Sequence, residues 1–170
     1  MVVLEYIYNM FISIFTNGVI IAPMIAWITA QILKTIINCI VNKKIDWTRM
    51  FGDGGMPSAH SATVTALAIV IGDVSGFDSP VFGLAIMFAS VVMHDALGVR
   101  REAGKQAVAV LRIADVLKNY FEEHDMNLKT EKLKVLVGHT PTQVVCGSLW
   151  GLFVAAVYIV LRHTAFGIPI

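Results

Sequence analysis

The chain has 170 residues, of which 56% are apolar and only 15% are charged, and its formal net charge is +1. This composition excludes an ordinary soluble domain and, with a positive mean hydropathy, indicates an integral membrane protein in contact with the bilayer. We expect no nucleic-acid partner.

Apolar stretches long enough to cross a bilayer, which takes about 20 helical residues or roughly 17 for a short span, recur along the chain. The first, residues 11–41, is either one tilted span or an interfacial segment followed by a helix from about residue 19. Residues 1–18 leave the number of N-terminal spans open. We predict four spans, at about 19–41, 58–74, 80–99 and 141–161.

The second span is rich in Ser, Thr and Ala, the small residues that let helices approach closely in a bilayer, so we place it in the interior of the bundle. Residues 100–139 are polar with helical periodicity, which predicts an amphipathic helix outside the hydrocarbon. The predicted fold class is therefore all-α: a membrane-embedded helical bundle forming a single domain over residues 1–170. Self-association into a homo-oligomer is left open.

Basic residues are distributed unevenly between the loops. They gather in residues 42–56 and 100–134, whereas residues 72–79 contain Asp73 and Asp78 and no base. By the positive-inside rule, the first two segments are predicted to be cytoplasmic and the third external, with both chain termini outside.

This topology brings polar groups from separate helices to the cytoplasmic face. They are Lys34, Ser58, His60, His94, Asp95, Arg100, Arg101, Lys105, His139 and Gln143. Ionisable residues at membrane depth are costly and tend to mark a functional site. Imidazoles, several cations and a helix N-terminus together suit phosphoryl transfer, because they stabilise the negative charge of the transferring group and can move protons near neutral pH.

The segment before the second span has the residues that a phosphate cradle needs. Gly54, Gly55 and Pro57 would let the backbone approach an anion, and Ser58 is predicted to cap the helix. One histidine can attack phosphorus while another protonates the leaving oxygen. His139 and Gln143 are four residues apart, so on a helix they share a face, and the Gln143 carbonyl can orient the imidazole.

Three stretches carry a family resemblance. "GMPSAHSA" (55–62) and "GHTPTQVVCG" (138–147) resemble the paired histidine signatures of the type 2 phosphatidic acid phosphatases and vanadium haloperoxidases. "HDALGVRREAGKQ" (94–106) is similar to a block of their divergent bacterial and plastid branch, and the resemblance covers roughly residues 30–160.

The resemblance implies a membrane phosphatase that hydrolyses a lipid phosphate or diphosphate through a phosphohistidine, with the site at the cytoplasmic face of a bacterial cell membrane. It makes His139 the nucleophile, His60 the acid and Ser58 part of the phosphate cradle. It implies no metal and no other cofactor.

The chain departs from the family pattern at three places. In the motif KxxxxxxRP, Lys43 and Arg49 are one residue too close and no proline follows; the arginine expected six residues before the nucleophile falls on Leu133. The carboxylate expected to orient the nucleophile is Gln143, which cannot stabilise imidazolium as a carboxylate does. Asp95 can supply the missing charge.

An arginine of the branch-specific block, Arg100 or Arg101, can replace the one missing before the nucleophile. The alternative function is a non-catalytic binder or transporter of anionic lipid headgroups with a degenerate phosphatase site. A third reading is a zinc site of His60, His94, Asp95 and His139, which the surrounding bases disfavour because they repel a cation.

Ordinary roles also remain open for individual residues. Lys34 can snorkel to the interface, Asp95 can pair with Arg100 or Arg101 as a clamp, and Lys105 can belong to a solvated face attracted to anionic lipid.

Overall fold

A computed structural model describes residues 2–43, 55–123 and 139–166. Within these ranges the chain forms helices and no strand, which confirms the predicted all-α class. The helices are α1 (Val2–Thr16), α2 (Gly18–Asn42), α3 (Ala59–Ser75), α4 (Pro80–Leu97), α5 (Val99–Glu123) and α6 (Pro141–Phe166).

The helix lengths fit a membrane bundle. Among the described residues, three stretches are long and apolar enough to cross a bilayer: Gly18–Asn42, Pro80–Leu117, which continues from α4 into α5, and Pro141–Ala165. Helix α3 has 17 residues and is about 25 Å long at 1.5 Å per residue, which is near the lower limit for a span. The predicted four-span bundle is consistent with these helices.

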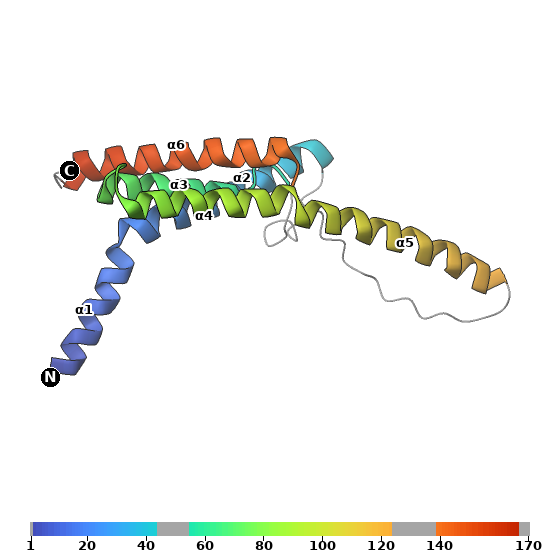
Figure 1. Cartoon of the computed structure of the whole chain (residues 1–170), viewed down its shortest axis with the longest axis horizontal. Coiled ribbons are helices and arrows are strands. Elements are labelled where there is room, and N and C mark those ends of the chain that lie inside the picture. Colours follow the sequence, from blue (N-terminus) through green and yellow to red (C-terminus); the bar gives the residue numbers. More distant parts are fainter. Residues whose placement is uncertain (1, 44–54, 124–138, 167–170) are drawn as a thin grey trace.

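The N-terminal apolar stretch is two helices. Asn17 interrupts it, and its side-chain oxygen accepts a hydrogen bond of 2.9 Å from the backbone N–H of Val19, which begins α2. The expectation of one tilted span over residues 11–41 is therefore wrong, and the alternative of a separate segment before the first span is confirmed. Helix α1 is exposed along its length and leaves the bundle at an angle (Figure 1).

The predicted amphipathic segment begins as expected. Helix α5 covers the first part of residues 100–139, is largely exposed and projects past the end of the bundle (Figure 1). Residues 124–138 of this segment, and most of the predicted basic loop 42–56, lie outside the described residues.

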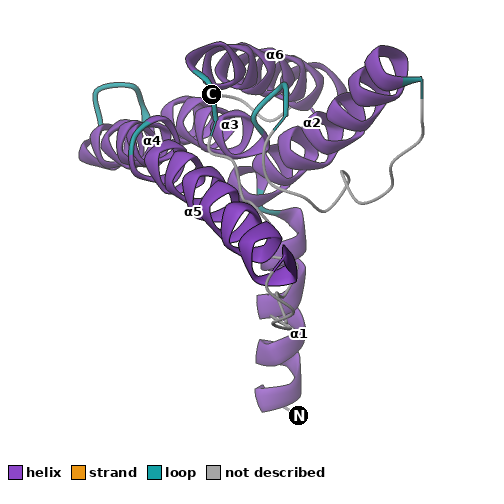
Figure 2. Ribbon diagram, turned by 90° about the vertical axis from the view of Figure 1, so that its right-hand side faces the viewer, coloured by secondary structure: helices purple, strands orange, loops and turns teal. Residues whose placement is uncertain are grey.

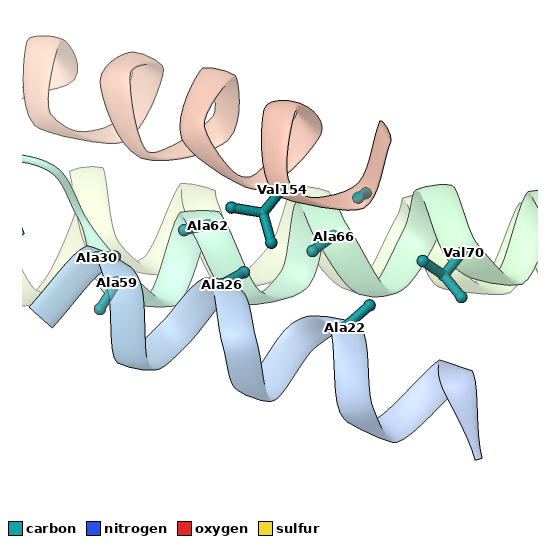
Figure 3. Close-up of a cluster of buried hydrophobic side chains, with 9 residues drawn as sticks. Ala22, Ala26, Ala30, Ala59, Ala62, Ala66, Val70 and Val154 are labelled. Atoms are coloured by element: carbon teal, nitrogen blue, oxygen red, sulfur yellow. The ribbon is translucent and has the colours of Figure 1, made fainter. Parts of the chain in front are cut away.

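Helix α3 is the central element and packs against α2, α4 and α6 (Figure 2). Its contacts are made by small side chains four residues apart, so the backbones approach closely. The buried residues at this spacing are Ala22, Ala26 and Ala30 in α2, and Ala62, Ala66 and Val70 in α3 (Figure 3). The placement of the second span in the interior is confirmed.

Two glycines let α6 lie directly against the backbone of α3. A Cβ atom at Gly151 would come 2.2 Å from the carbonyl oxygen of Ala62, and one at Gly147 would come 2.4 Å from that of Ser58. Any side chain at either position would therefore force the two helices apart.

The contacts also fix the helix directions. The start of α6 meets the start of α3, and the Trp150 Nε1–H donates a hydrogen bond of 3.0 Å to Thr29 Oγ1 of α2. Helices α3 and α6 are parallel, and α2 and α4 run against them. The N-termini of α3 and α6 therefore lie together with the C-termini of α2 and α4, at the end of the bundle that faces the viewer in Figure 2.

At the opposite end of the bundle, Asp73 joins α3 to α6. It lies in the last turn of α3, where its carboxylate is 3.3 Å from His163 Nε2 and 3.6 Å from an Arg162 guanidinium nitrogen, both in α6. The residues next to His163 in the sequence do not indicate this pairing, because Asp73 lies on a helix distant in the chain.

Candidate functional site

Residues 55–58, which we call the Ser58 segment, precede α3. This segment is hydrogen-bonded to α6 and caps α3. Ser58 is fully buried, and its N–H donates a hydrogen bond of 3.0 Å to the Gln143 carbonyl. Its Oγ accepts hydrogen bonds from the N–H of Ser61, at 3.3 Å, and from the Ser61 hydroxyl, at 3.1 Å. The predicted N-cap is therefore present, and it places His60 in the first turn of α3.

The structure brings the two motif histidines together. His139 lies just before α6, is 4% exposed, and its N–H donates a hydrogen bond of 3.3 Å to the carbonyl of Ala96 in α4. Its ring faces the half-buried His60 ring edge-on, with the centroids 6.0 Å apart and the planes at 89°. Imidazoles from separate sequence motifs thus share one end of the bundle.

Gln143 has a local role at the start of α6. Its side-chain Oε1 accepts a hydrogen bond of 3.1 Å from the N–H of Thr140, and the Thr140 Oγ1 accepts one of 3.4 Å from the N–H of Gln143. This reciprocal pair is a capping box at the start of α6. The oxygen expected to orient the His139 imidazole is therefore used by the helix cap.

Lys34 continues the alanine stripe of α2 toward this end of the bundle. It follows Ala30 by four residues and is only 5% exposed, so it does not extend freely to the interface. Its methylene groups pack on Gly55: a Cβ there would lie 2.8 Å from the Lys34 Cδ. Gly55 also has a φ of +96°, which side chains rarely adopt, so glycine is required for two reasons.

The remaining polar candidates are less central. Asp95 is half-buried beside Ala96, whose carbonyl holds His139, whereas His94 is exposed. Pro57 is buried within the Ser58 segment, and Gly54 lies outside the described residues.

The described bases of α5, Arg101, Lys105 and Arg112, are exposed. Lys105 Nζ is 2.6 Å from Glu102 Oε1, and this hydrogen bond holds the pKa of the Glu102 carboxyl below its ordinary value. Arg101 and Lys105 line a cavity of about 460 Å³ that reaches Thr140, beside His139. Arg100 is in the first turn of α5, and its side chain is outside the described structure.

The zinc reading does not fit the geometry. Within the described ranges, no three His, Cys, Asp or Glu side chains lie close enough together to hold a metal ion. His94 is exposed, whereas His139 is buried.

The arrangement favours an anion. The first amides of a helix have no partners within it, and the helix dipole adds partial positive charge at that end. Two such N-termini, those of α3 and α6, meet around His60 and His139, and Lys34 packs against the preceding segment. Paired imidazoles can supply both a nucleophile and a proton donor.

Two features at the start of α6 were missed from the sequence, although both carried a signal. The run Thr140–Gln143 has the S/T-x-x-E/Q pattern of a capping box, and Gly147 and Gly151 have the spacing of a helix-packing motif.

Comparisons with known proteins place this geometry in a family. A family model described as "Divergent PAP2 family" matches residues 15–154, which include both histidines. The chain is also 37% identical over 151 residues to YuiD of Bacillus subtilis (strain 168), an uncharacterized membrane protein; the match covers 85% of this chain and 96% of that one. No solved structure shows a significant match.

Proposed function

The chain belongs to the divergent PAP2 family, and we propose that it hydrolyses a lipid phosphate or diphosphate at the end of the bundle where His60 and His139 meet. The observation that carries the proposal is the edge-on pair of imidazoles 6.0 Å apart, between two helix N-termini. The family resemblance supports the same pair as the reactive groups.

In the proposed reaction, a ring nitrogen of His139 attacks phosphorus while protonated His60 gives its proton to the leaving lipid oxygen. The phosphorus–oxygen bond to the lipid breaks and a phosphohistidine forms. Neutral His60 then takes a proton from water, whose oxygen attacks phosphorus and releases phosphate from His139. The ring centroids are 6.0 Å apart, so the two imidazoles are neighbours that can face the same phosphoryl group.

The neighbouring residues would hold the phosphoryl oxygens. Ser58 and the first amides of α3 form one side of the cradle, and Lys34 adds positive charge behind Gly55. Asp95 can support His139 through the end of α4. We assign Arg100, Arg101 and Lys105 an outer role: they raise the local concentration of anionic headgroups without contacting the reacting group.

A lipid substrate is favoured because the helices around the site belong to an integral membrane protein. By the distribution of basic residues, we propose that the site faces the cytoplasm of a bacterial cell.

The test is phosphate release from dodecyl phosphate by the purified protein in detergent. We expect His60→Ala and His139→Ala each to lose at least about a hundredfold in rate, the usual minimum for an acid–base group. His94→Ala is the matched control, because His94 is exposed on the neighbouring helix and should retain the rate. Full activity in either motif variant would exclude the mechanism.

One observation favours a second function, the binding of anionic headgroups without turnover. The position where the family has a carboxylate is Gln143, and its side-chain oxygen is used in the α6 cap. A protein that binds dodecyl phosphate at equilibrium but releases no phosphate, with binding lost in Lys34→Met, would support the binder and exclude the phosphatase.

A further inference from the structure

An apolar groove runs between α2 and α6 beside the Ser58 segment. Its volume is about 350 Å³. The residues that line it include Leu33 and Ile37 of α2, Cys146, Leu149 and Trp150 of α6, and Met56. We call this cavity the α2–α6 groove.

The groove adjoins a second, polar cavity. This cavity has a volume of about 150 Å³, is lined by Lys34, Asn38 and Gly55 among others, and shares Ile37 and Met56 with the groove. One end of the combined space therefore has a buried cation and an amide, and the other is lined by apolar side chains, with the Trp150 N–H bonded to Thr29. That division matches an amphiphile with an anionic head.

The α2–α6 groove is open along one side. Trp150 lines the groove, and its indole N–H donates the hydrogen bond to Thr29 that joins α6 to α2. Leu149 is 61% exposed, so the side of the groove opens outward from the bundle, where a membrane supplies acyl chains. A chain can enter laterally without passing through water.

We propose that the α2–α6 groove holds the hydrocarbon chain of a single-chain lipid phosphate, whose headgroup lies at Lys34 and the start of α3. This inference rests on the proposed function, because it assigns the tail of the same substrate. One chain is specified because the groove lies at the small end of the range for ligand pockets, about 300–1,000 Å³.

Cys146 provides a direct test that needs no turnover. Its thiol lines the groove, and the other cysteine, Cys39, is equally half-buried but lines neither cavity. We expect dodecyl phosphate at about ten times its Kd to slow modification of Cys146 by a small methanethiosulfonate about tenfold. Inorganic phosphate should not slow it, and Cys39 should react at the same rate throughout. Equal slowing of both cysteines, or of neither, would overturn the proposal.

The second test is a substitution that fills the α2–α6 groove with a larger side chain. Cys146→Phe should lower the rate for dodecyl phosphate relative to butyl phosphate by about tenfold or more, because several methylene groups lose their contacts. Val145→Phe is the matched control, since Val145 is the adjacent, 57% exposed residue, and should keep the wild-type ratio. An equal ratio in both variants would overturn the groove.

The two assays separate the inference from the function on which it rests. If wild-type protein hydrolyses neither substrate but dodecyl phosphate still protects Cys146, the phosphatase fails and the groove stands. If both substrates are hydrolysed at one rate and Cys146 is not protected, the phosphatase function is supported and the binding of the lipid chain in the groove is contradicted. Should Cys146→Phe not fold, the labelling of the wild-type thiols decides.

Discussion

The two ends of the α3–α6 pair have different chemistry. At one end the His60 and His139 rings face one another, 6.0 Å apart. At the other end Asp73 pairs with His163 and Arg162 at distances of 3.3 and 3.6 Å. At each end, therefore, a histidine next to or in α6 faces a side chain of α3. For His139 that side chain is the imidazole of His60, and for His163 it is the carboxylate of Asp73.

The helix directions explain the difference. Because α3 and α6 are parallel, both N-termini lie at the His60 end and both C-termini at the Asp73 end. Partial negative charges at the C-termini favour cations, and Arg162 supplies one beside Asp73, whose carboxylate also lies 3.3 Å from His163 Nε2. At the other end the C-termini of α2 and α4 are also present, but the residues around His60 and His139 are the N-termini of α3 and α6, whose partial positive charges Lys34 reinforces. An anion is therefore expected at the His60 end, and a structural ion pair at the Asp73 end.

The largest effect on both ends is expected when the α3–α6 interface is forced apart. Gly151→Ala would put a Cβ 2.2 Å from a backbone oxygen of α3, which side-chain motion cannot relieve. We expect the free energy of unfolding to fall by about 3 kcal/mol, the upper range for overpacking, and phosphate release to fall with it. Unfolding in mixed micelles with increasing dodecyl sulfate measures the change.

Gly83→Ala is the control for that substitution. Gly83 is also a helical glycine, but nothing lies within 4 Å of the added Cβ. It should be neutral or stabilise by up to about 1 kcal/mol through helix propensity. Equal effects of the two substitutions would mean that the close approach of α3 and α6 is not needed.

A substitution at Asp73 should lower the stability of the protein without changing its ability to bind an anion at the His60 end. Asp73→Asn leaves Arg162 and His163 without their carboxylate, and we expect a loss of about 1–3 kcal/mol in the free energy of unfolding. Dodecyl phosphate binding at a temperature where the variant is folded should be retained. Asp78→Asn, on the exposed turn that follows α3, controls for lost charge. Loss of binding in the folded Asp73→Asn protein would contradict the division between the ends.

Most of the fold could be predicted from apolar length and small residues. The predicted spans agree with α2, α3, α4 and α6 to within a few residues, because prolines at Pro80 and Pro141 open two of the helices. The pairing of Asp73 with His163 could not be predicted. It depends on α3 and α6 being parallel neighbours, which is a property of packing rather than of either segment.

The site was predicted unevenly, for reasons that the residues show. Ser58, His60 and His139 lie in motifs and were correctly expected at one end of the bundle; their catalytic roles remain proposals. Lys105 has an acidic partner three residues away in its own helix, a pairing that the spacing of Glu102 and Lys105 already indicates. Gln143 was read by its spacing from His139, although a local helix cap competed for the same side chain.

Gln143 allows the His60 end to be examined more finely. Gln143→Glu keeps an oxygen for the Thr140 N–H and adds negative charge to the first turn, so stability should be unchanged or slightly higher. Gln143→Ala loses the cap, with an expected cost of about 0.5–1 kcal/mol. Because the side chain serves α6, we expect phosphate release to change less than about tenfold in both, a factor worth ~1.4 kcal/mol. A large gain in Gln143→Glu would instead identify the amide as the limit on turnover.

The smallest effect concerns whether Lys105 belongs to the anion site. Its hydrogen bond lowers the pKa of Glu102 in the folded protein, so the pair stabilises α5 above the unfolded carboxyl pKa and this contribution is lost as the pH falls through the lower folded value. Lys105→Met should return the Glu102 pKa toward its ordinary value in a carboxyl NMR titration, whereas Arg112→Met should not. In the wild type, dodecyl phosphate should leave the Glu102 pKa low. A rise on adding dodecyl phosphate would show that the lysine leaves Glu102 for the phosphate, and the anion site would then extend onto α5.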